Sequence, residues 1–274
     1  MTFPKKSFEI DGSTMSVVDV GSGPVVLLAH GWLCDASMWD AQIRALTSRY
    51  RVIVPEMWGH GESAAMPKTA EVMRDLARQH CDLLDQLEVE KAAIIGLSLG
   101  GMWGAELALI APARVSSLAL LATSLAAEPP GSRVEFLAGV EDMAERSAVS
   151  SDLADALVSL LYSANFSAAE PAVVAAHRAR LTAWEPERIA DSVAPIGRII
   201  FNRRDALADL QGLSMPVLTI AGGEDRALPK VLVEQMAERI GSAFTEVPKV
   251  GHMLTYEAPA FLNEALLAFL ALAH

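Results

Sequence analysis

The sequence predicts an α/β fold: a mostly parallel, eight-stranded sheet that is flanked by helices and interrupted by one helical insertion. Short apolar runs alternate with segments of helical periodicity over residues 24–121, and the alternation resumes over residues 216–272. Such alternation implies parallel strands joined by right-handed crossovers. The stretch between about 125 and 210 contains no convincing buried strand and is expected to be helical. A chain of 274 residues is long enough for one large domain with such an insertion.

The N-terminal half begins with two alternating stretches, residues 7–11 and 14–20, which predict a β-hairpin around Asp11-Gly12-Ser13. Residues 24–29 are continuously apolar, as is typical of a strand covered on both faces. A helix is expected at 69–88 because apolar residues recur on one side of it. These residues are Val72, Leu76, Cys81, Leu84 and Leu87. The other expected elements are helices at 37–48 and 101–110 and strands at 51–55, 92–97 and 115–121.

The C-terminal half repeats the alternation. Its expected elements are a strand at 216–221, a helix at 229–240, a strand at 243–247 and a helix at 258–272. We therefore expect a core formed by residues 1–127 and 191–274, with residues 128–190 inserted as a helical cap. The alternative interpretation is that the inserted helices simply extend the core.

Composition and charge exclude several classes of function. The formal net charge of −12 disfavours nucleic acid and anionic membranes as partners. No segment resembles a membrane span or a signal peptide. The two cysteines, Cys34 and Cys81, do not make a disulfide framework, and we expect reduced thiols in a cytoplasmic protein. Metal-ligand spacings and phosphate-binding loops are absent from the sequence, so we expect neither a metal nor a cofactor.

The pentapeptide Gly96-Leu97-Ser98-Leu99-Gly100 is the clearest chemical motif. It lies between an expected buried strand and an expected buried helix, which is the context of a nucleophile elbow. The serine of such an elbow lies at a sharp turn, where side chains at the two glycine positions would collide with the neighbouring strand and helix. Ser98 is therefore the candidate nucleophile.

A serine hydroxyl needs a base within hydrogen-bond reach, and the base needs an orienting partner. In the elbow architecture these follow the serine in the order acid, then histidine. Asp225 directly follows the expected strand at 216–221, and His252 follows the strand at 243–247. Active groups of such sheets gather at the carboxyl ends of strands, so both fit. Glu224, and more distantly Glu128, are the alternative acids.

Acyl transfer also needs hydrogen-bond donors aimed at its oxyanion. One donor is expected to be the backbone N–H of Leu99, directly after the nucleophile. The second is expected to be the backbone N–H of Trp32, because Gly31 permits an unusual turn after the strand at 24–29. His30 and His60 precede Ser98 in glycine-flanked turns, and their expected role is to hydrogen-bond those turns.

Together these motifs resemble the α/β-hydrolase fold family of serine hydrolases over nearly the whole chain outside the cap. The matching segments are His30-Gly31-Trp32, Gly59-His60-Gly61-Glu62-Ser63, Gly96-Leu97-Ser98-Leu99-Gly100-Gly101, Gly223-Glu224-Asp225 and Gly251-His252. The resemblance implies the same triad and the same two oxyanion donors. Within the family, the stretch from His30 resembles bacterial aryl esterases and cofactor-free perhydrolases, and the elbow is similar to 3-oxoadipate enol-lactonases. His-Gly-Trp together with the elbow also resembles carboxylesterases of pimeloyl methyl esters.

The chain departs from the family pattern in the loop before the Gly-His-Gly turn. The family usually has an Asp and an Arg there, whereas this chain has Glu56 and, in place of the Arg, Trp58. This departure bears on the subfamily, because any ion pair that the arginine makes elsewhere is absent.

Apolar and aromatic residues near the expected site favour an apolar acyl or alcohol group in the substrate. The residues expected to bind it are Leu33, Trp58, Met102, Phe136, Tyr162, Trp184 and Met253. The sequence predicts a cofactor-independent serine hydrolase of a small, largely apolar carboxylic ester or lactone. The alternatives are a C–C bond hydrolase of a β-diketone-like substrate with the same triad, and a small-molecule receptor on this fold. The oligomeric state is not predicted.

Overall fold

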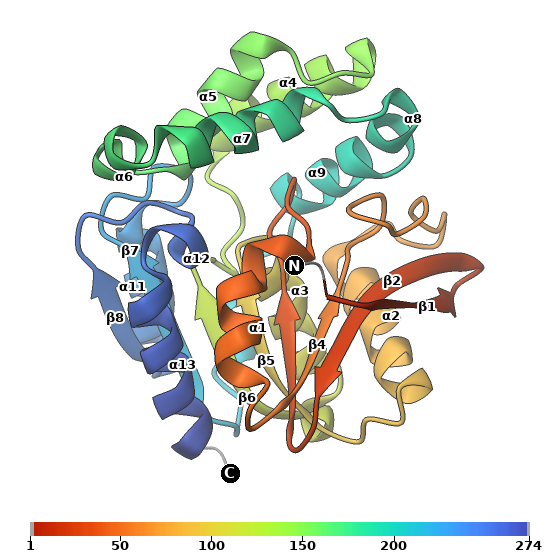
Figure 1. The fold of residues 1–274 in the computed structure, drawn as a ribbon, viewed down its shortest axis with the longest axis vertical. Coiled ribbons are helices and arrows are strands. Elements are labelled where there is room, and N and C mark those ends of the chain that lie inside the picture. Colours follow the sequence, from red (N-terminus) through yellow and green to blue (C-terminus); the bar gives the residue numbers. More distant parts are fainter. Residues whose placement is uncertain (1–2, 273–274) are drawn as a thin grey trace.

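The computed structural model describes residues 3–272. Over this range the chain forms an eight-stranded sheet with the order β1-β2-β4-β3-β5-β6-β7-β8 (Figure 1). β2 pairs antiparallel with β1 and with β4, and all other neighbours are parallel. The predicted mostly parallel, eight-stranded sheet is therefore confirmed. The strands are β1 (Lys5–Ile10), β2 (Ser13–Gly21), β3 (Val25–Ala29), β4 (Arg51–Pro55), β5 (Ala92–Leu97), β6 (Val115–Leu121), β7 (Val217–Gly222) and β8 (Ala243–Val247).

The hairpin between β1 and β2 turns at Asp11 and Gly12, which have φ values of +50° and +76°. Two successive left-handed residues make the tight turn whose twist matches that of the flanking strands. The hairpin predicted from the sequence is confirmed, and it extends the sheet at one edge.

Helices cover both faces of the sheet, as Figure 1 shows. Apolar side chains of α1 and α13 pack on one face, and those of α2, α3 and α11 pack on the other. Outside the region between β6 and β7, the helices are η1 (Ala36–Trp39), α1 (Asp40–Leu46), α2 (Met73–Gln86), α3 (Leu99–Ile110), η2 (Pro112–Arg114), α11 (Lys230–Ile240), α12 (Leu254–Glu257) and α13 (Pro259–Leu272).

The helix expected at 69–88 is shorter than predicted, because α2 begins only at Met73. The carboxylate of Asp75, in the first turn of α2, accepts hydrogen bonds from the backbone N–H groups of Glu71 and Val72. It thereby caps the N-terminus of the helix. Val72, which was expected on the apolar side, lies before the helix and is 54% exposed.

The region between β6 and β7 is helical and contributes no strand to the described sheet. Figure 1 shows its helices lying across the end of the sheet toward which the parallel strands run. α9 continues the helical region beyond residue 190; its Ile196 and Ile200 pack with the sheet's core, while Ala194 packs with the other inserted helices. The helices are α4 (Pro130–Arg146), α5 (Ser151–Leu161), α6 (Ala164–Ala169), α7 (Pro171–Thr182), α8 (Pro186–Arg188), η3 (Ile189–Val193), α9 (Ala194–Phe201) and α10 (Leu207–Leu210).

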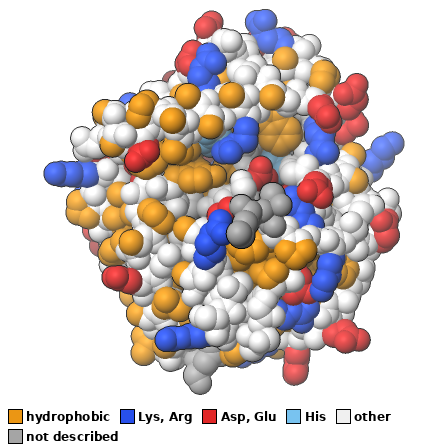
Figure 2. Space-filling model, in the orientation of Figure 1, with side chains coloured by type: hydrophobic (Ala, Val, Ile, Leu, Met, Phe, Trp, Pro, Cys, Tyr) orange, Lys and Arg blue, Asp and Glu red, His pale blue; other side chains and the backbone are white. Residues whose placement is uncertain are grey.

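Charged side chains of both signs are interspersed over the face seen in Figure 2. That face carries no continuous basic patch of the kind that binds a polyanion. Within residues 3–272, no helix is long and apolar enough to cross a membrane.

A glycine pair tests how tightly the turn before α3 is packed. We expect Gly100→Ala to lower the free energy of unfolding by on the order of 3 kcal/mol, because its Cβ would lie 2.1 Å from the backbone oxygen of Ala29. Gly131→Ala is the matched control, since a Cβ there has no atom within 4 Å, and we expect a change below about 1 kcal/mol. Equal stabilities of the two variants in urea denaturation would contradict this packing.

Candidate active site

Ser98 stands at the turn from β5 into α3 with φ +55° and ψ −118°. A positive φ is strained for a residue with a side chain and persists only where the surroundings enforce it. Here the two glycines allow close packing around the serine. A Cβ on Gly96 would lie 2.4 Å from the backbone of Gly100, and one on Gly100 would meet Ala29 of β3. The collisions expected from the sequence therefore hold at both glycine positions.

Asp225 follows β7, and His252 lies between the last strand, β8, and α12. Asp225 Oδ2 lies 2.8 Å from His252 Nδ1, and Asp225 Oδ1 accepts a hydrogen bond of 2.8 Å from the N–H of Leu228. The Asp225 side chain is fully buried and that of His252 is 6% exposed. A carboxylate only accepts, so Nδ1 is the donor in this contact, and the other ring nitrogen, Nε2, is the atom that can act as a base.

Ser98 and His252 line the same cavity of about 310 Å³, which lies between the sheet and the inserted helices. Most of its wall is apolar. From the inserted helices it includes Phe136, Gly139, Val140, Met143, Leu153, Ala156, Leu157, Leu160, Leu161, Ile200 and Phe201. The cavity is thus concave and apolar, with a few polar groups, as small-molecule sites are.

The structure brings five of the sequence-predicted residues to this cavity besides Ser98 and His252. They are Trp32, Leu33, Met102, Phe136 and Met253. Phe136 stacks on Phe201, with ring centroids 4.7 Å apart.

Three residues that were expected to bind substrate do not line this cavity. Trp58 is fully buried in the core, where its Nε1 donates to Gln79. Tyr162 is also fully buried, and its hydroxyl lies 2.8 Å from His177 Nδ1. Trp184 packs edge-on against a buried histidine and faces a different, more open pocket. Aromatic character near a predicted site does not tell on which side of a turn or helix the ring lies.

The two expected oxyanion donors belong to segments that adjoin Ser98. Leu99 is the first residue of α3, so its N–H has no partner within the helix and lies at the positive end of the helix dipole. Trp32 follows Gly31, where a Cβ would lie 3.7 Å from the Cβ of Ser98. The Trp32 indole donates to the backbone oxygen of Val193, which ties this loop to the inserted helices.

Comparison with known proteins agrees with this architecture. Residues 24–259 match the sequence profile described as alpha/beta hydrolase fold. The chain belongs to the α/β-hydrolase fold family. It is 31% identical over 258 residues to a putative carbamate hydrolase of Azorhizobium caulinodans, a match that covers 91% of this chain and 92% of the relative.

Solved structures show the same similarity. A thermophilic esterase from Thermogutta terrifontis has a TM-score of 0.88 at 27% identity, with 99% of each chain covered. The enol-lactonase from Burkholderia xenovorans has a TM-score of 0.85 at 25% identity, covering 97% of this chain and 100% of its own. The family match and these relatives support the assignment of the chain as a hydrolase.

The loop that carries His252 is hydrogen-bonded to the junction between α5 and α6. The N–H groups of His252 and Met253 donate to Leu161 O at 2.9 and 3.2 Å. The Glu257 carboxylate accepts from the N–H groups of both Gly251 and Ser163. The inserted helices therefore both hydrogen-bond to the loop that carries His252 and form part of the cavity wall.

Sequence reasoning missed one polar feature of the cavity, a buried ion pair between Arg203 and Glu128 at 2.9 Å. Burial lowers the pKa of Arg203, and Glu128 opposes that shift. The sequence offers Glu128 only as an alternative triad acid, but Glu128 pairs with Arg203, whereas Asp225 contacts His252. No motif marks Arg203, because its partner lies on a distant segment of the chain.

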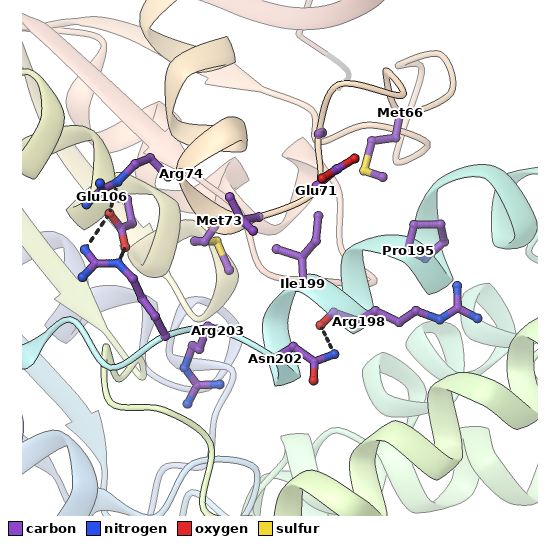
Figure 3. A pocket seen from close by; sticks show the side chains of 13 residues that line it. Met66, Glu71, Met73, Arg74, Glu106, Pro195, Arg198, Ile199, Asn202 and Arg203 are labelled. Carbon is purple, nitrogen blue, oxygen red and sulfur yellow. Dashed lines mark hydrogen bonds and ion pairs between the residues drawn. The ribbon is translucent and has the colours of Figure 1, made fainter.

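Arg203 also lines a second cavity of about 560 Å³ on the other side of α9, shown in Figure 3. There Arg74 and Arg204 converge on the buried carboxylate of Glu106. Each arginine that lines this cavity is already paired with a carboxylate, so the lining offers no unpaired cation to an anionic ligand.

Cys34 lies in the wall of the cavity that holds Ser98. Burial, reinforced by the neighbouring charge of Asp35, raises the pKa of the Cys34 thiol to about 12. The thiol thus stays protonated at neutral pH, and a protonated thiol is a poor nucleophile. Within residues 3–272, no cluster of three or more His, Cys, Asp and Glu side chains is arranged to hold a metal ion.

Buried neutral histidines make the fold sensitive to acid. Burial lowers the pKa of His60 to about 3 and those of His80 and His177 to about 4, from an ordinary value of 6.5. These rings take up a proton only on unfolding, so the free energy of unfolding should fall as the pH drops below 6.5. We expect His60→Gln to make this fall shallower, by up to about 1.4 kcal/mol per pH unit. Urea denaturation at several pH values between 7.5 and 4.5 gives the free energy of unfolding of the wild type and of His60→Gln. The same dependence on pH in both proteins would contradict the prediction.

Proposed function

We propose that the protein is a cofactor-independent serine hydrolase that cleaves a small, largely apolar carboxylic ester or lactone through an acyl-enzyme. The observation that carries the proposal is the hydrogen bond between Asp225 and a His252 ring that shares a cavity with Ser98. The relatives named esterase and enol-lactonase support the same class of reaction.

In the proposed acylation, Ser98 Oγ attacks the carbonyl carbon of the ester while His252 Nε2 takes the hydroxyl proton. Asp225 stabilises the imidazolium that forms. The N–H groups of Leu99 and Trp32 stabilise the tetrahedral oxyanion. His252 then returns the proton to the leaving alkoxide, and an acyl group remains on Ser98.

Deacylation repeats these steps with water as the nucleophile. His252 takes a proton from the water as it attacks the acyl carbon, and then gives that proton to Ser98 Oγ as the acid departs. The balance is one water consumed for one ester or lactone bond cleaved. No step needs a cofactor.

The proposed domain organisation follows from the cavity. Residues 128–190 act as a helical cap whose side chains close the cavity over Ser98, with Phe136, Val140 and Leu160 in the wall. α9 extends this roof and joins it to the core.

Removal of the base or nucleophile gives the direct test. We expect Ser98→Ala and His252→Ala each to lower kcat for a short-chain p-nitrophenyl ester by about 10³-fold or more, with little change in Tm. Ser98→Ala should also abolish labelling by a fluorophosphonate probe. Glu264→Gln, on an exposed part of α13, is the control and should retain full activity. Wild-type turnover in either alanine variant would sink the proposal.

The charges in the cavity predict which acyl groups it accepts. The wall holds two carboxylates, Glu128 and Glu135, but only one cation, Arg203. We therefore expect the neutral substrate p-nitrophenyl butyrate to have a kcat/KM at least about 10-fold above that of mono-p-nitrophenyl succinate. The free carboxylate of the succinate would lose its hydration in the cavity and lie near carboxylates of the same charge. A preference for the succinate would contradict this view of the cavity.

A further inference from the structure

Two buried histidines hold the loop that carries Trp32. His30 Nδ1 lies 2.8 Å from the backbone oxygen of Gly31, and His60 Nε2 accepts a hydrogen bond of 3.1 Å from the N–H of Leu33. The first contact fixes the peptide group before Trp32, and the second fixes the peptide group after it. Both rings are buried, with exposures of 2% and 0%.

The partners of the two rings determine their protonation. A carbonyl oxygen only accepts, so His30 Nδ1 donates to Gly31, while its Nε2 accepts from the N–H of Met57 at 2.8 Å. His60 follows the same pattern, since its Nδ1 donates to Trp58 O at 2.8 Å. Each ring is therefore neutral, with one donor and one acceptor that are both in use.

Peptide geometry turns these contacts into a statement about Trp32. The described residues contain no cis peptide bond, so the Gly31 C=O and the Trp32 N–H point in opposite directions from one planar group. Because the Gly31 oxygen is directed at the His30 ring, the Trp32 N–H is directed to the opposite side. Gly31 itself lies against the Ser98 turn.

We propose that His30 and His60 are positioning residues that orient the Trp32 N–H toward the oxyanion formed at Ser98. The inference rests on the proposed function, in which Trp32 supplies an oxyanion donor. The histidines touch neither substrate nor reacting atoms; they act through the two peptide groups that flank Trp32.

Other contacts at this loop are weaker constraints. The N–H of Cys34 also reaches the Gly31 oxygen, but at 3.3 Å, a longer distance than that to the His30 ring. Leu33 has a φ of +62°, which is strained for a leucine and needs an external partner to persist. The contact from His60 to the Leu33 N–H supplies that partner.

Asparagine and glutamine separate the two functions of each ring. An asparagine amide lies near the position of a histidine Nδ1, and a glutamine amide reaches the position of Nε2. His30→Asn therefore retains a donor to Gly31, whereas His30→Gln loses it and retains an acceptor for Met57. At the second ring the order reverses: His60→Gln retains the acceptor for Leu33, and His60→Asn loses it.

The four variants are compared by kcat and KM for p-nitrophenyl butyrate, with Tm as the measure of stability. We expect kcat to fall about 10- to 100-fold in His30→Gln and His60→Asn, with KM within about 3-fold of wild type, because the misdirected donor matters in the transition state. His30→Asn and His60→Gln should keep kcat within about 3-fold of wild type.

The inference is supported if asparagine preserves kcat better than glutamine at position 30, and glutamine preserves it better than asparagine at position 60. A kcat that follows Tm across the variants, or equal losses for Asn and Gln at both positions, overturns the inference. If one His30 variant does not fold, the His60 pair still gives the comparison. Ser98→Ala measured alongside separates the two proposals: its full activity would refute the serine hydrolase itself, whereas its inactivity without the reversed preference refutes only the positioning role.

Discussion

At the turn from β5 into α3, Ser98 has a positive φ, and the strand and helix pack closely around it because Gly96 and Gly100 carry no side chains. The same close approach brings the start of α3 against β3, and Gly31 in the loop after β3 lies against the Ser98 turn. Everything else in the proposed chemistry is placed relative to this turn. Parallel strands then deliver Asp225 and His252 to the same edge of the sheet, as their carboxyl ends must.

The inserted helices have two physical effects on this edge. They supply most of the apolar wall over Ser98. At their α5–α6 junction, Leu161 O accepts the hydrogen bonds of His252 and Met253, and the Ser163 N–H donates to the Glu257 carboxylate. Those contacts include a half-buried carboxylate, Glu257, whose pKa is raised by burial. A change in the inserted helices is therefore expected to affect the position of the base as well as the shape of the cavity.

The sequence predicted the fold well because each strand of the parallel sheet is a short apolar run, and such runs are easily read. It also selected Asp225 and His252 by their position after strands, and the structure places these two side chains in contact. Their catalytic roles, like that of Ser98, stay predictions. The start of α2 was missed because a capping carboxylate, not an apolar residue, determines it.

The lining of the cavity that holds Ser98 was harder to predict. Trp58 and Tyr162 are aromatic and close to the motifs, but hydrogen bonds to Gln79 and His177 hold them in buried positions away from the cavity. The place of Arg203 in the cavity wall was not predicted, because its ion-pair partner Glu128 lies on a distant segment. A pairing of that kind leaves no local pattern in the sequence. Which residues share a cavity is a property of helix packing, which periodicity does not specify.

The proposed catalysis proceeds through an acyl group carried by Ser98. Rapid mixing with p-nitrophenyl butyrate, acid quenching during the first turnover and mass spectrometry of the digested protein measure this directly. We expect one butyryl group on the peptide that contains Ser98, formed in step with the burst of p-nitrophenol and absent from Ser98→Ala. Turnover without any acylated peptide, or an acyl group on another residue such as Cys34, would contradict it.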